Sequence, residues 1–136
     1  MIEIADVSQV SRATLYNHYR DKDSVLLALC ESELARLVEI AQNASDATSA
    51  LEQISLQVSS DPALAAMRVQ DPDLLTLALS KHDDNLWKAF SIALTHLLGE
   101  GKSALALRWL LGQALHPINE QQSRAQAEAI TGIANL

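Results

Sequence analysis

Apolar residues recur at intervals of three and four positions along most of the chain, the spacing that places them on one face of an α-helix. The pattern is clearest from residue 22 to about residue 43, and it recurs from 86 to 98. In the first of these helices the apolar stripe consists of Leu26, Leu29, Cys30, Leu34, Leu37, Val38 and Ala41. The remaining face is expected to carry the charged residues Glu31, Glu33, Arg36 and Glu39.

Helix starts can be read from cap residues and prolines. Asp-Pro pairs at 61–62 and 71–72 each place a cap residue before a proline at the first helical position, so they predict two helix starts and a short first helix. Ser49 and Glu52 have the spacing of a capping box, and the polar cluster 81–85 is expected to break or kink the helix before it.

The carboxyl-terminal part predicts two more helices. Residues 103–116 are apolar on two sides, so this helix needs two packing partners. Pro117 ends it, and Asn119 with Gln122 can cap a last, alanine-rich helix over residues 120–134. In total we expect seven or eight helices with short connections.

Composition agrees with an all-α chain, because Leu and Ala far outnumber Val and Ile and there are only 4 Gly and 3 Pro in 136 residues. A hydrophobic content of 49% with 20% charged residues argues against disorder. The single cysteine, Cys30, cannot form an internal disulfide and suits a reducing compartment. Without a long apolar run or a signal peptide pattern, we expect no membrane contact and a cytoplasmic location.

The charge is unevenly placed. The chain carries a formal net charge of −7, yet the stretch 7–20 contains no Asp or Glu. That stretch holds Arg12, Tyr16, His18, Tyr19 and Arg20. A locally basic window with tyrosines is a candidate surface for an anionic partner, and a chance run of uncharged residues is an equal alternative.

The same region is predicted to form a helix, a tight turn and a second helix that begins after the N-cap residue Ser11. A helix-turn-helix places the amino-terminal half of its second helix in the major groove of DNA. The side chains then available for base edges are Arg12, Ala13, Thr14 and Asn17. Those available for phosphates are Tyr16, His18 and Lys22.

The segment from Ile4 to Leu29, with the string VSRATLYNHY followed by RDK, closely resembles the DNA-binding signature of the TetR family of bacterial transcriptional regulators. The resemblance implies backbone contacts from Thr14, Tyr16, His18 and Lys22. It also implies that the residues nearest the bases are Arg12, Ala13, Tyr16 and Asn17. The rest of the chain is similar only in organisation. We therefore expect an incomplete helix-turn-helix region at 1–22, joined to a helical effector-binding and dimerisation bundle at 23–136.

Two features depart from the family pattern. Gln9 and Ser8 stand where the family usually has Gly and Ala, so the turn is expected to be adjusted. The family's first helix, which packs across the motif, has no counterpart before Met1. The alternatives are a start further upstream, a fragment, and a true loss of the DNA-reading unit.

A small-molecule pocket between helices is a further expectation, with an ordinary core as an equal alternative. Its candidate lining residues are Met67, Trp87, Phe90 and His96. His82, His96 and His116 lack the spacing of a metal site. Because a Gly-rich phosphate loop and a nucleophile motif are also missing from the sequence, we expect no metal, no cofactor and no enzymatic activity.

The two apolar sides of the 103–116 helix predict a homodimer. The internal side is expected to consist of Leu107, Leu110, Leu111 and Ala114. The side facing a two-fold-related copy is expected to consist of Leu105, Trp109, Gly112 and His116, joined by the last helix. In the competing interpretation both sides are buried within one subunit.

These patterns together favour a ligand-responsive transcriptional regulator, a repressor that binds operator DNA as a homodimer and responds to a small-molecule effector. The alternative is a dimeric helical ligand-binding or interaction protein that no longer binds DNA.

Overall fold

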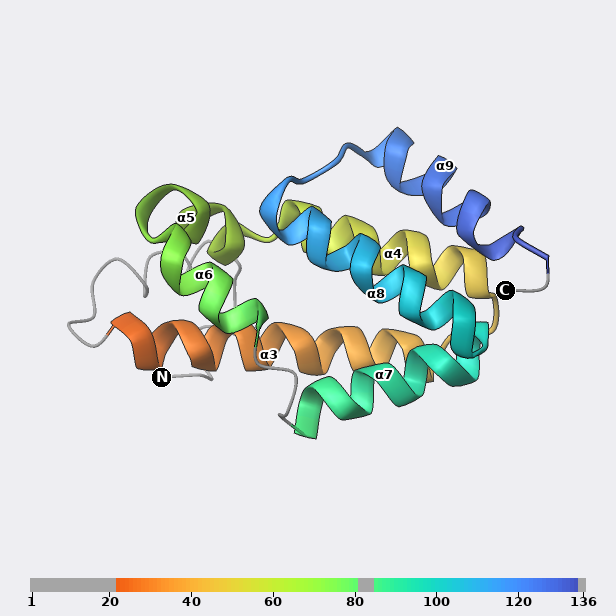
Figure 1. Cartoon of the computed structure of the whole chain (residues 1–136), viewed down its shortest axis with the longest axis horizontal. Coiled ribbons are helices and arrows are strands. Elements are labelled where there is room, and N and C mark those ends of the chain that lie inside the picture. The colour runs from red at the N-terminus through yellow and green to blue at the C-terminus, as the bar shows by residue number, and fades with distance from the viewer. Residues whose placement is uncertain (1–21, 81–84, 135–136) are drawn as a thin grey trace.

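The structure, a computed structural model, describes residues 22–80 and 85–134, and all regular structure in these residues is α-helical (Figure 1). The helices in these two ranges are α3 (Lys22–Gln42), α4 (Ala47–Ser60), α5 (Pro62–Gln70), α6 (Pro72–Leu79), α7 (Asn85–Leu98), α8 (Glu100–Leu115) and α9 (Glu120–Thr131). The chain is therefore all-α, as its composition predicts. Within the described residues no helix is both long and apolar enough to cross a lipid bilayer.

The long helix α3 forms one side of the bundle, and α7 packs along it. Helix α8 lies between α7 and α4, and α9 covers α4 and α8 from outside (Figure 1). The short helices α5 and α6 close the end of the bundle beside the first half of α3. The apolar stripe expected on α3 faces this interior, with Leu26 and Leu29 almost fully buried. The largest fully buried apolar side chains are Phe90, Leu26, Leu51, Ile54, Met67, Leu75 and Leu94.

Three of the predicted helix caps are confirmed. The carboxylate of Asp61 accepts a hydrogen bond from Leu64 N at 3.0 Å, and that of Asp71 accepts one from Leu74 N at 3.2 Å. Asn119 forms the expected capping box of α9 with Gln122. Because each cap uses residues within one turn of chain, the local sequence is enough to specify it.

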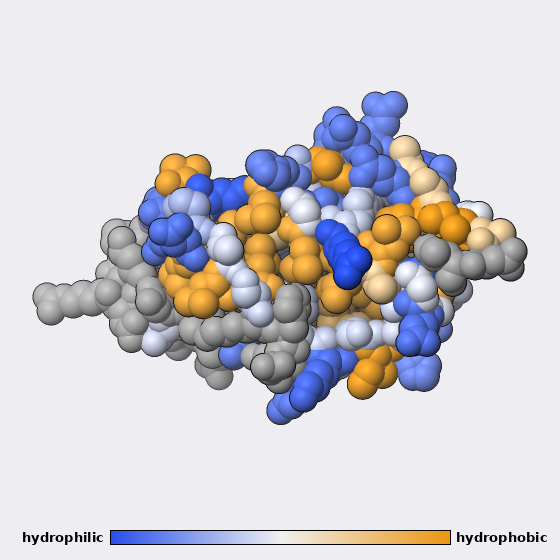
Figure 2. Space-filling model, in the orientation of Figure 1, coloured by the Kyte–Doolittle hydropathy of each residue, from blue (hydrophilic) through white to orange (hydrophobic). Residues whose placement is uncertain are grey.

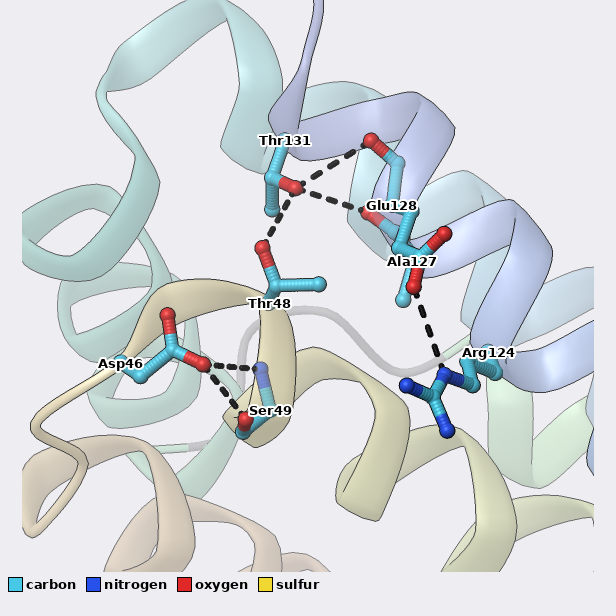
Figure 3. Close-up of polar contacts among 7 residues, drawn as sticks. All are labelled: Asp46, Thr48, Ser49, Arg124, Ala127, Glu128 and Thr131. Carbon is cyan, nitrogen blue, oxygen red and sulfur yellow. Dashed lines mark hydrogen bonds and ion pairs between the residues drawn. The ribbon is translucent and has the colours of Figure 1, made fainter.

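The predicted capping box at Ser49 is wrong. Helix α4 begins at Ala47, and its N-cap is Asp46, whose carboxylate accepts a hydrogen bond from Ser49 N at 3.0 Å (Figure 3). Ser49 lies in the first turn and is a donor to the cap rather than the cap itself. An aspartate three residues upstream offers the backbone a charged acceptor, which is a stronger cap than a serine hydroxyl.

The α7–α8 junction also differs from the expected boundary. Gly99 alone adopts a left-handed φ of 88°, and α8 starts at Glu100 rather than at Ser103. Gly101 is helical, so only one of the two glycines marks the turn. The end of the last helix differs too, because α9 ends at Thr131, three residues before the predicted end at about residue 134.

Helix α9 is attached to its own chain at both ends. The hydroxyls of Thr131 and Thr48 lie 2.7 Å apart, joining the last turn of α9 to the first turn of α4 (Figure 3). Lys102 Nζ donates to the carbonyl of Thr131 at 2.9 Å. At the other end Ser123 is buried, and its hydroxyl is hydrogen-bonded to that of Ser55, 2.7 Å away. The last helix is therefore part of the subunit core, in addition to any contact with a second copy.

The burial of residues on the two sides of α8 agrees only in part with the predicted internal and outer sides. On the predicted internal side Leu110 and Ala114 are buried, whereas Leu107 and Leu111 are half-buried. On the predicted outer side the exposed residues are Leu105, Gly112 and His116. Trp109 is half-buried instead, because α9 packs beside it. Sequence periodicity finds the two sides of such a helix, but it does not say which neighbour covers each one.

Candidate functional site

A cavity of about 160 Å³ lies among α3, α5, α6, α7 and α8. Most of its wall is apolar, including leucines from α3, α5 and α8. Three alanines, Ala63, Ala78 and Ala114, line it from three different helices, and their short side chains leave the space between the helices unfilled. Figure 2 shows apolar atoms gathered over α8 and beside α6 on this face of the molecule.

Three of the four predicted pocket residues line this cavity, namely Met67, Trp87 and Phe90. The fourth, His96, does not, and it is exposed on α7. His96 comes six residues after Phe90, which places it about 120° around the helix axis from Phe90. Phe90 and His96 therefore cannot lie on the same face of α7. The prediction of His96 as a pocket residue was wrong, and the helical period of the sequence is enough to show it.

Three carboxylates that we did not predict as site residues also line the cavity, those of Glu31, Glu33 and Asp61. Glu33 is only 6% exposed and Asp61 only 1% exposed. Sequence periodicity assigned Glu33 to the charged face of α3, whereas the structure buries it at the cavity wall. Its carboxylate Oε2 lies 3.3 Å from Arg36 Nη1, and this ion pair lowers the cost of burying the charge.

Asp61 serves as both a helix cap and part of the cavity wall. It ends α4 and caps α5 through Leu64 N. Its negative charge raises the pKa of nearby Arg68, but burial of the guanidinium lowers that pKa more strongly, so the pKa of Arg68 lies below its usual value. Arg68 Nη1 donates to the carbonyl of Ala114 at 2.6 Å. Arg68, on α5, is thereby joined to the last turn of α8.

Cys30 adds a half-buried thiol to the cavity wall, where a plain buried apolar residue was expected. Within the residues that the structure describes, no group of three His, Cys, Asp or Glu side chains is placed to hold a metal ion. The chemistry of this cavity is therefore that of an apolar wall with a few carboxylates.

The predicted DNA-contacting residues Arg12, Ala13, Thr14, Tyr16, Asn17 and His18 lie outside the described residues. The seventh, Lys22, is the first residue of α3. The same helix lines the cavity from Leu29 to Leu37. One continuous helix thus starts at the end of the predicted DNA-binding region and forms a wall of the cavity.

Comparison of the chain with models of protein families, with curated protein sequences and with solved structures finds no match.

Proposed function

We propose that the chain is a ligand-responsive DNA-binding transcriptional regulator, a repressor that binds operator DNA as a homodimer. The observation that carries the proposal is the course of α3, which begins at Lys22 and lines the cavity about two turns later at Leu29. The resemblance of residues 4–29 to the TetR signature supports the DNA-binding half of the proposal. The cavity supports the ligand-binding half.

Helix α3 offers a simple route for coupling ligand binding in the cavity to DNA binding. A ligand in the cavity favours the position of α3 that fits it best, and a rigid helix carries this displacement to its first residue. In a dimer the two DNA-reading units must meet successive major grooves about 34 Å apart. A ligand that changes this separation lowers the affinity for DNA, and DNA lowers the affinity for the ligand by the same factor.

The outer face of α8 supports the homodimer. Leu105 is 38% exposed and Leu115 is 42% exposed, although both are large and apolar. A Cβ atom added at Gly112 would meet nothing within 4 Å in the described chain, so this position is open to a second copy. A two-fold interface needs such a self-complementary patch. We propose that Leu105, Gly112 and His116 lie in it, with the exposed edge of Trp109.

The DNA-binding half can be tested by selection from a random pool of duplexes with protein made from the complete gene. We expect enrichment of a two-fold symmetric site. Arg12→Ala should relax the preference at one or two base pairs by about 1–3 kcal/mol. Lys22→Ala should weaken binding to all duplexes alike and reduce its salt dependence. Arg124→Ala, on the exposed side of α9, is the matched control and should change neither property.

Absence of any enriched sequence, or binding that survives replacement of Arg12, Tyr16 and Lys22 together, would overturn this half. The chain would then be better described as a dimeric helical ligand-binding protein without DNA recognition.

A further inference from the structure

We infer that the cavity takes a neutral, apolar molecule about the size of a single six-membered ring. The inference rests on the proposed function and deepens it, because this molecule would be the effector. The class of the ligand follows from the material of the wall, which is mostly hydrocarbon, and its size follows from the cavity volume of about 160 Å³.

Most of the described wall consists of apolar side chains that belong to the buried core. Leu29, Leu37 and Leu110 line the cavity and are each more than nine-tenths buried. Met67 and Phe90 line it too and are almost completely buried. A ligand among these side chains exchanges contact with water for contact with hydrocarbon. This exchange is favourable for apolar surface and costly for a polar or charged group that finds no new partner.

The carboxylates in the wall are held by the protein, so they do not set the charge of the ligand. Asp61 caps α5 by accepting a hydrogen bond from Leu64 N, and Glu33 is paired with Arg36. Both carboxylates also take part in further interactions within the structure. Glu31 is exposed and stays in contact with water. The surface that the wall offers to a ligand is therefore apolar.

Three alanines account for the unfilled space. Ala63, Ala78 and Ala114 are buried and reach the cavity from α5, α6 and α8. Side chains that face an unfilled space lack the dispersion contacts of a close-packed core. An apolar molecule supplies these contacts, and the unbranched side chain of Met67 can adapt to its shape. Such a molecule binds the folded state and should therefore also stabilise it.

The volume limits the size of the ligand. A cavity of about 150 Å³ with an apolar wall in an engineered protein core binds benzene. The present cavity, of about 160 Å³, therefore suits a benzene-sized ring. Toluene is a suitable probe, because it is neutral and adds only a methyl group to the ring. Phenol has nearly the same size and adds a hydroxyl, whereas benzylamine and benzoate carry a positive and a negative charge at neutral pH.

Isothermal titration calorimetry with the full chain compares the four probes. We expect toluene to bind at least about tenfold more tightly than phenol, because a hydroxyl that leaves water without a new partner is costly. Benzylamine and benzoate should bind more weakly still, because a charge is harder to remove from water.

Two results of this titration would overturn the inference. Equal or tighter binding of phenol, benzylamine or benzoate would overturn the ligand class and leave the ligand-responsive function standing. Failure of all four probes to bind would overturn the inference together with the ligand-responsive half of the proposed function. The two failures are therefore distinguishable.

Matched variants locate the binding site. Ala63→Leu places a larger apolar side chain at the cavity wall, so it should abolish toluene binding while circular dichroism still shows a helical fold. Ala65→Leu makes the same change at an exposed position of α5 that does not line the cavity, and should leave the affinity unchanged. Ala114→Leu fills the cavity from α8 and repeats the test if Ala63→Leu fails to fold. Unchanged toluene binding in the filled variants, or an equal loss in Ala65→Leu, would overturn the assignment.

Nuclear magnetic resonance locates the ligand in the unaltered protein, without any substitution. The sequence contains two methionines, Met1 and Met67, and Met67 is fully buried at the cavity wall. We expect nuclear Overhauser effects between the ring protons of toluene and the ε-methyl group of Met67. Toluene that binds without this contact would lie elsewhere, and the assignment of the cavity as its site would be wrong.

Discussion

The indole nitrogen of Trp109 donates a hydrogen bond to the side-chain oxygen of Gln126, at 2.6 Å. This bond joins α8 to α9 within one subunit and fixes how the two helices lie against each other. Sequence periodicity assigned Trp109 to a contact with a second copy, but much of its surface is already covered by its own chain. The residues of the predicted outer side that stay exposed are Leu105, Gly112 and His116, and the exposed Leu115 lies beside them on α8.

The first prediction concerns Leu105. If the outer face of α8 is the dimer interface, Leu105→Glu places a negative charge on each side of the two-fold axis. The dimer association constant should then fall by about tenfold, which corresponds to a loss on the order of 1–3 kcal/mol in the free energy of association. Light scattering over a concentration series measures the change. Leu77→Glu is the control, because Leu77 is also large, apolar and 54% exposed but lies on α6.

An association constant that is unchanged by Leu105→Glu, or equally weakened by Leu77→Glu, would contradict the α8 interface. The first result would favour the competing interpretation, in which the subunit itself covers both sides of α8.

The second prediction concerns the buried hydroxyl of Ser55, which donates to Gln113 Oε1 at 2.6 Å and whose oxygen is also hydrogen-bonded to the hydroxyl of Ser123, 2.7 Å away. Ser55→Ala removes the group that connects α4 to both α8 and α9. We expect the free energy of unfolding, measured with urea, to fall by about 1–3 kcal/mol because buried polar partners lose hydrogen bonds.

Ser60→Ala is the matched control on the same helix. Its hydroxyl is exposed and contacts only the carbonyl of Leu56 one turn earlier. The expected change is within about 0.5 kcal/mol. Equal losses of stability in the two variants would show that the hydrogen bonds of the buried Ser55 hydroxyl contribute no more to the free energy of unfolding than an exposed serine does.

Local signals in the sequence predict the helices well and the cavity only in part. Asp61, Asp71 and Asn119 cap helices with residues one turn away, so their roles can be read from a few neighbouring letters. Glu33 is different, because its burial depends on the cavity and on helices distant in the sequence. An amphipathic pattern assigns every charged residue to solvent, and it misses the rare one that is paired and buried.

The third prediction concerns Asp46, whose hydrogen bonds from the Ser49 hydroxyl and backbone hold the pKa of its carboxyl below the usual value (Figure 3). A carboxyl with a lowered pKa stabilises the fold above its unfolded-state value of about 3.9, and this contribution is lost as the pH falls through the folded-state value. The stability advantage over Asp46→Asn should therefore be present at neutral pH and decrease progressively as the pH falls below about 4.

Urea unfolding at several pH values measures this difference. Ser49→Ala removes the hydroxyl that contributes most to the lowered pKa, so it should reduce the pH dependence without abolishing it. A difference between wild type and Asp46→Asn that stays constant from pH 3 to pH 7 would contradict the assignment.

The last prediction concerns Arg68, which lies on α5 and donates a hydrogen bond to the carbonyl of Ala114 on α8. The last four carbonyls of a helix have no partner within it, and Ala114 lies in the last turn of α8. Arg68→Met keeps an unbranched apolar side chain and removes the donor. We expect a loss of about 1 kcal/mol in global stability, together with faster amide hydrogen exchange in the last turn of α8. Arg124→Met removes an exposed arginine from α9 and should change neither measurement by more than about 0.5 kcal/mol. If Arg68→Met lowered stability but left exchange at the end of α8 unchanged, the assignment of Arg68 as the partner of the last turn of α8 would be disproved.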